Sequence, residues 1–211
     1  MTSQASILLI VVIVLFLTVW LRRWRNPGRQ VNVIENPRVA VASLGEEPSR
    51  DIGETDARVY SAFFSNVEMA KLETTGALLD LIGNGRPDIL HLYCAMSEDG
   101  GLTDGRGGTL PGGGLLEACR RAGVKLLFFA SDNPAENYGR AFKGHRRGSG
   151  GGVDVVWTIK RSGDRFPFFL GELLRRMSKG ESMPMAWVRI APQAEGEWME
   201  KLPSTIYAPN Q

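Results

Sequence analysis

The sequence predicts an α/β domain with a mainly parallel β-sheet flanked by helices, preceded by one N-terminal transmembrane helix. Three observations support this prediction: short β-branched apolar runs alternate with helical patterns, an uncharged apolar segment lies near the N-terminus, and the composition is that of a globular protein. The chain has 211 residues, of which 43% are hydrophobic and 23% charged. This length accommodates one domain with a substantial core in addition to an anchor.

Charge and cysteine content argue against several classes of protein. Lys and Arg number 25 against 23 Asp and Glu, so the net charge of +2 is too small for a general nucleic-acid surface. Cys94 and Cys119, with only two His in the chain, lack the spacing of a zinc site and cannot staple a secreted mini-domain. We therefore expect no metal, no cofactor and no nucleic-acid partner, and we expect both thiols to be free.

Residues 1–25 are predicted to form a transmembrane anchor with a basic flank. The 17 residues from Ala5 to Leu21 carry no charge, and as a helix they would rise about 25 Å, close to the thickness of the hydrocarbon core. Arg22, Arg23, Arg25 and Arg29 follow, which predicts a single-pass protein of the cell membrane with its C-terminal domain in the cytoplasm. A cleaved signal peptide and a buried helix are alternatives, although the basic start and the small-residue cleavage site of a signal peptide are missing.

Residues 26–37 are predicted to be a linker and residues 38–211 to form the α/β domain. Candidate strands are Arg38 to Ser43, Val67 to Leu72, Asp88 to Cys94, Val124 to Ala130 and Val153 to Ile159. The last three are continuous apolar runs, which is typical of strands covered on both faces. We therefore expect them in the middle of the sheet.

Helical spacing and end signals predict the helices between and after these strands. Leu115 to Ala122 form one helix, with Gly123 as its C-cap. Asn133 is predicted to be the N-cap of the next helix, and the apolar stripe from Phe166 to Met177 indicates a third helix that packs on the core. Residues 182–190 fit one more helix, although a strand over 187–190 fits the pattern as well.

Two glycine-rich segments are predicted to be mobile loops. Residues 97–114 contain eight glycines, and residues 143–152 combine five glycines with Lys143, Arg146 and Arg147. Neither segment matches a phosphate-binding motif placed between a strand and a helix.

Ligands of an open parallel sheet bind outside the carboxyl ends of its strands, so the residues that follow each strand are the candidate site. We call these residues the carboxyl rim: Ser97, Glu98, Asp99, Ser131, Asp132, Asn133, Lys160 and Arg161. Their side chains predict a binding surface of mixed charge.

A nucleophilic site would need a Ser or Cys beside a base, and the residues offer Ser131 or Cys94 with His91. His91 and Cys94, however, lie three residues apart on one strand and point to opposite faces of the sheet. His91 lies between leucines and is predicted to be a core residue. Ser131, Asp132 and Asn133 also have structural uses at a strand end and helix start.

The sequence resembles the CHAT domains of the caspase-like peptidase clan. The resemblance rests on the run Pro87 to Cys94, the Gly-rich loop with Leu102 and Asp104, the helix with Leu115, the run Val124 to Ala130, and the two-helix segment Gly171 to Ala186. It covers roughly Arg38 to Gln193 and implies a caspase-like fold.

Active members of this family carry a His-Gly pair after the first of these runs and a Cys after the second. The matching positions here hold Ala95, Met96 and Ser131. The resemblance therefore implies a catalytically inactive module that binds or scaffolds a protein partner, in signalling or defence. Two other readings stay open: a hydrolase that uses Ser131 with a base from elsewhere, and a sensor that binds a nucleotide or other anion through Lys160 and Arg161.

Overall fold

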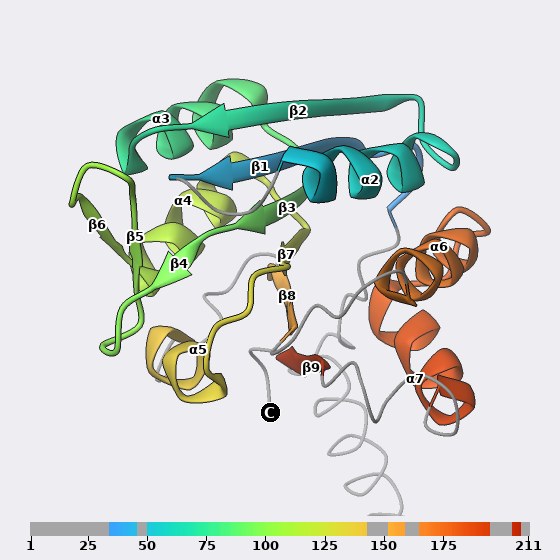
Figure 1. Ribbon diagram of the computed structural model, residues 1–211. Coiled ribbons are helices and arrows are strands. Elements are labelled where there is room, and N and C mark those ends of the chain that lie inside the picture. Colours follow the sequence, from blue (N-terminus) through green and yellow to red (C-terminus); the bar gives the residue numbers. More distant parts are fainter. Residues whose placement is uncertain (1–33, 46–49, 143–151, 159–164, 195–203, 208–211) are drawn as a thin grey trace, which may run out of the picture. The chain divides into compact units, whose positions relative to one another are not determined.

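The computed structural model describes residues 34–45, 50–142, 152–158, 165–194 and 204–207, which belong to one compact unit, Asn32–Gln211. A six-stranded sheet lies at its centre, in the order β2-β1-β3-β7-β8-β9 (Figure 1). The strands are β1 (Arg38–Leu44), β2 (Asn66–Leu72), β3 (Ile89–Tyr93), β7 (Leu126–Phe129), β8 (Asp154–Thr158) and β9 (Ser204–Tyr207). The first five are parallel and β9 pairs with β8 in antiparallel fashion, so the predicted mainly parallel sheet is confirmed.

Helices cover both faces of the sheet. They are α2 (Arg50–Ser61), α3 (Thr75–Asp80), the π-helix η1 (Leu81–Gly85), α4 (Gly112–Ala122), α5 (Ala135–Phe142), α6 (Arg165–Met177) and α7 (Met183–Ala194). Buried residues of α2, α6 and α7 pack on one face, and those of α3, η1, α4 and α5 pack on the other. The flanking helices predicted from the sequence are therefore confirmed.

Strand β3 contributes to both hydrophobic cores. Ile89 and Tyr93 belong to the core under α2 and α6, whereas Leu90, Leu92 and Cys94 belong to the core under α4 and α5. All of its residues are buried, as expected of a strand that is covered by helices on both faces. Its place between β1 and β7 agrees with the central position expected from the sequence.

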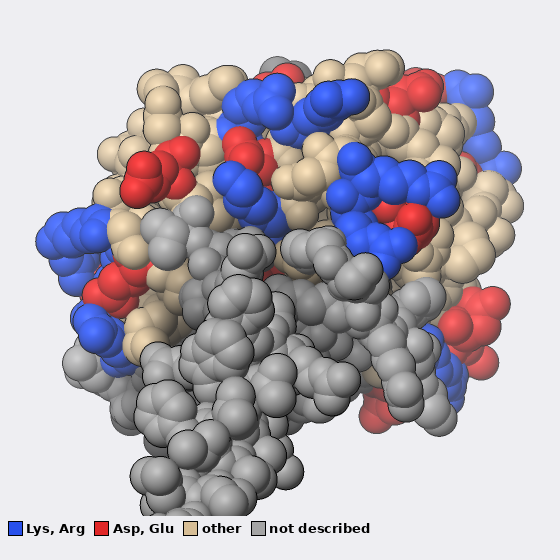
Figure 2. Space-filling model, turned by 180° about the vertical axis from the view of Figure 1, so that it is seen from behind, with Lys and Arg blue, Asp and Glu red and all other residues tan. Residues whose placement is uncertain are grey.

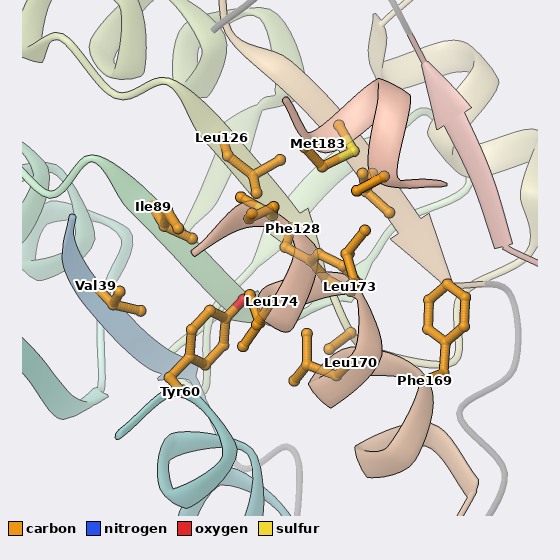
Figure 3. Packing of buried hydrophobic residues seen from close by; sticks show 14 of the residues in the cluster. Val39, Tyr60, Ile89, Leu126, Phe128, Phe169, Leu170, Leu173, Leu174 and Met183 are labelled. Atoms are coloured by element: carbon orange, nitrogen blue, oxygen red, sulfur yellow. The ribbon is translucent and has the colours of Figure 1, made fainter. Parts of the chain in front are cut away.

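The apolar stripe of α6 packs on the sheet as predicted. Figure 3 shows Leu170, Leu173 and Leu174 of α6 in the same cluster of buried side chains as Phe128 of β7. These three leucines are 0% exposed, and burying such a side chain contributes roughly 1.5–3 kcal/mol. Residues 183–194 form α7, so the helical alternative for this segment is the correct one.

The glycine-rich segment 97–114 is not the loop that was predicted. It folds into a three-stranded antiparallel sheet of β4 (Ala95–Met96), β5 (Gly101–Thr103) and β6 (Thr109–Pro111), followed by the start of α4. Its glycines allow close packing: a Cβ on Gly100 would lie 2.4 Å from Ala141 N, and one on Gly112 would lie 2.6 Å from Ala141 Cβ. The other glycine-rich segment, at residues 143–151, lies outside the described residues.

The folded unit begins before Arg38. Ile34 is 2% exposed and belongs to the core under α2 and α6, so the last residues of the expected linker are part of the fold. The expected anchor, residues 1–25, lies outside the described residues. Among the residues that the structure does describe, no helix is both long enough and apolar enough to cross a bilayer.

Charges of opposite sign lie together on the surface. Figure 2 shows Lys and Arg side chains next to Asp and Glu side chains on one face of the molecule. Lys125 and Asp88 approach to 3.1 Å at the amino ends of β7 and β3, and Arg121 and Glu117 approach to 2.9 Å on α4.

Candidate functional site

The carboxyl ends of β3 and β7 bring the residues after these two strands together. The last ladder bond runs from the N–H of Ala130 to the carbonyl of Leu92, at 3.0 Å. Beyond it, the N–H of Cys94 donates to the Ser131 hydroxyl oxygen at 2.8 Å. The Ser131 side chain thus continues the pairing of the two strands beyond their last backbone hydrogen bond.

Asn133 extends this side-chain pairing by two residues. Its Oδ1 accepts from the N–H of Met96 at 2.9 Å, and its Nδ2 donates to the carbonyl of Cys94 at 2.9 Å. The sequence predicted Asn133 to be the N-cap of a helix, and this prediction is wrong. The helix α5 begins at Ala135, and the Asn133 amide is hydrogen-bonded to the backbone of Cys94 and Met96. The amide offers donor and acceptor together, as a strand backbone does.

Tyr138 and Asn137 fasten α5 to the same segment. The Tyr138 hydroxyl donates to the carbonyl of Ser131 at 3.0 Å, and Asn137 Nδ2 donates to the carbonyl of Met96 at 3.2 Å. Both side chains are buried. The geometry of residues 94–96 therefore depends on α5 as well as on β7.

Positions 95 and 131, which the resemblance to CHAT domains matches to catalytic residues, follow these adjacent strand ends. Ala95 is exposed in β4 and carries only a methyl group, which cannot accept a proton. Ser131 is 8% exposed, and its oxygen already accepts the Cys94 N–H. A serine hydroxyl has almost no anionic fraction at neutral pH without a base, so this pair cannot perform nucleophilic catalysis on its own.

His91 does not supply the missing base. It points into the opposite core from Cys94, is 0% exposed and stacks on Phe128 with a ring-centre distance of 5.0 Å. The Tyr60 hydroxyl lies 3.1 Å from its Nδ1 and Asp56 Oδ2 lies 3.3 Å from its Nε2. The prediction that His91 is a core residue is confirmed.

Asp56 and the tyrosines complete this buried polar cluster. The Tyr93 hydroxyl donates to Asp56, whose side chain is 0% exposed. Burial raises the pKa of the Tyr60 hydroxyl well above its ordinary value, and the neighbouring Asp56 carboxylate raises it further. Tyr60 therefore keeps its proton, and its hydroxyl donates a hydrogen bond to His91 Nδ1 when that ring nitrogen carries no hydrogen. Sequence reasoning missed Asp56 and Tyr60, because the segment that forms α2 was not among the predicted helices.

The thiols of Cys94 and Cys119 are buried and free, as predicted. Burial raises the pKa of Cys119 to about 12 and raises that of Cys94 as well. Since the thiolate is the reactive form, neither thiol is suited to chemistry in the folded protein.

The loop between β4 and β5 forms a structured acidic turn in the carboxyl rim. Ser97 Oγ donates to Asp99 Oδ1, and the N–H of Gly101 donates to the same oxygen at 3.2 Å. These two hydrogen bonds, with that of Ser97 the stronger influence, hold the pKa of the Asp99 carboxyl below its usual value. Glu98 and Asp99 are both exposed, and Arg140 of α5 donates to the Glu98 carbonyl.

The structure brings together six of the eight rim residues: Ser97, Glu98, Asp99, Ser131, Asp132 and Asn133. Lys160 and Arg161 lie outside the described residues. Among the described members, Glu98, Asp99 and Asp132 are exposed acids, whereas Ser131 and Asn133 are buried and occupied by backbone partners. The exposed side chains among these described members are therefore acidic.

Asp104, which the sequence analysis named only as part of the family resemblance, has a structural role. Its carboxylate accepts from the N–H groups of Thr75, Arg106 and Gly108 at 2.9, 2.9 and 2.6 Å. The bond from Thr75 is the largest cause of a lowered pKa at Asp104. These hydrogen bonds fasten the turn between β5 and β6 to the start of α3. The Asp-Gly pair at 104–105 is the sequence signal for the turn itself.

Comparison with known proteins gives few matches. No protein-family model matches the chain, and neither does any curated protein. Among solved structures, the chain is similar to a signal receiver domain, that of NarL from Mycobacterium tuberculosis, with a TM-score of 0.43 and 16% identity. The match covers 70% of this chain and 100% of that chain.

Proposed function

We propose that the chain is a membrane-anchored, catalytically inactive caspase-like domain of the CHAT type, which acts as a binding or scaffold module. The observation that carries this proposal is that Ala95 and Ser131 follow the adjacent parallel strands β3 and β7, where the N–H of Cys94, the residue before Ala95, donates to the Ser131 hydroxyl. A histidine-cysteine dyad needs this adjacency, and the two residues present cannot provide its chemistry.

Position 95 holds no side chain that could accept a proton. Acyl transfer by a thiol or hydroxyl needs a group that accepts its proton within hydrogen-bond reach. At position 95 that group is replaced by a methyl, and among the described residues the one imidazole, His91, faces the other core. The Ser131 hydroxyl instead serves as a backbone acceptor, which is a structural role.

The binding role is assigned to the exposed part of the carboxyl rim. Glu98, Asp99 and Asp132 are exposed. They lie near the backbone of Met96, which Asn133 and Asn137 of α5 hold in place by hydrogen bonds. Rigid support of this kind lowers the entropy cost of binding a partner. The signalling or defence setting comes from the family resemblance alone.

The membrane anchor in this proposal is supported by the uncharged run from Ala5 to Leu21 and the four arginines after it. Lipid is accordingly one partner, through the N-terminal segment, and a protein is the other. The anion-sensing alternative depends on Lys160 and Arg161, which lie outside the described residues.

A serine-directed probe tests the loss of catalysis. The full-length chain in lipid nanodiscs is treated with a fluorophosphonate, and adducts are located by mass spectrometry. We expect no adduct at Ser131, with Ser131→Ala as the matched control. An adduct that forms at Ser131 and disappears with the folded state would overturn the inactive assignment and favour the hydrolase.

A charge reversal tests the binding role. Wild-type and Asp132→Lys chains are used to capture proteins from solubilised native membranes, with Glu73→Lys, an exposed change on the β2–α3 connection, as the control. A stoichiometric partner should be retained by the wild type and by Glu73→Lys and lost with Asp132→Lys. Equal capture by all three chains contradicts the assignment of the rim.

A further inference from the structure

We draw no further inference here: the strongest candidate, the pocket of about 370 Å³ between the start of α4, the β5–β6 strands and α5, carries nothing because it offers the backbone of a helix N-terminus at Gly112–Gly114 with two exposed side chains of opposite charge, Asp99 and Arg140, and no second observation among the described residues points to a ligand.

Discussion

The hydroxyl oxygen of Ser131 accepts a hydrogen bond from the backbone N–H of Cys94 at 2.8 Å, across the carboxyl ends of β7 and β3. This contact occupies the atom that would attack a substrate in a serine hydrolase. It also gives an acceptor to the buried N–H of Cys94, which lies beyond the last backbone hydrogen bond between the two strands. Ser131 is thus better explained by the stability of the strand ends than by catalysis.

Replacing Ser131 with Ala should destabilise the fold by about 1–3 kcal/mol, because the buried N–H of Cys94 loses its acceptor. Urea unfolding of the wild-type and variant domains measures this change. Ser97→Ala, which removes a hydroxyl from a partly exposed turn, is the matched control and should cost less. If Ser131→Ala leaves the stability unchanged while abolishing the biological activity, the structural role assigned to Ser131 is wrong.

The cluster of Asp56 and His91 should show strong energetic coupling. Removing one member of this buried polar contact leaves the other without its partner, at a cost of roughly 1–3 kcal/mol. We therefore expect Asp56→Ala and His91→Ala each to be destabilising, and the double variant to cost less than their sum. A double-mutant cycle measured by urea unfolding checks this, and additive costs would contradict the contact at 3.3 Å.

The buried thiols should react only after unfolding. Because burial raises the pKa of Cys119 to about 12, neither thiol should be alkylated at pH 8 until denaturant is added. Above about pH 8.5 the unfolded state releases thiol protons that the folded state retains, so stability should fall as the pH rises. Cys119→Ala should reduce this slope in pH-dependent urea unfolding. Rapid labelling of the folded protein would show that a thiol is accessible.

The amino-terminal segment should behave as an anchor, and the folded unit should begin before β1. Full-length protein is expected to resist extraction from membranes by alkaline carbonate, whereas a chain beginning at Val31 should be soluble and folded. A chain beginning at Arg38 loses Ile34, which is 2% exposed, and should be less stable by about 2–4 kcal/mol. Carbonate release of the full-length protein would disprove the anchor, and equal stability of the two shortened chains would disprove the role of Ile34.

The sequence allowed the parallel strands and the main helices to be predicted, because their patterns are local. β3 and β7 are buried throughout, and Gly123, with a φ of 84°, ends α4 as expected. The sheet of β4, β5 and β6 was not predicted, because its strands have only two or three residues each. It also depends on glycines that pack closely against Ala141.

The candidate site was only partly predictable for a related reason. The grouping of Ser97, Ser131 and Asn133 follows from the rule that strand ends meet at one edge. The hydrogen bond between the Asn133 amide and Met96 could not be predicted from the sequence. An asparagine suits an N-cap and such a bridge equally well. Only the three-dimensional distance between the 94–96 segment and β7 decides between these two roles.

The most direct test of the proposed function introduces the histidine and the cysteine of the proposed dyad at positions 95 and 131 and measures thiol reactivity. Ser131→Cys and the double variant Ala95→His, Ser131→Cys are alkylated in the folded state over a range of pH, with the wild type as background. If positions 95 and 131 form a lost dyad, the double variant should react about tenfold faster than the single variant at pH 7, with its pH profile shifted to lower values, because an adjacent imidazole favours the thiolate. Equal rates and pH profiles for two folded variants would contradict the central claim.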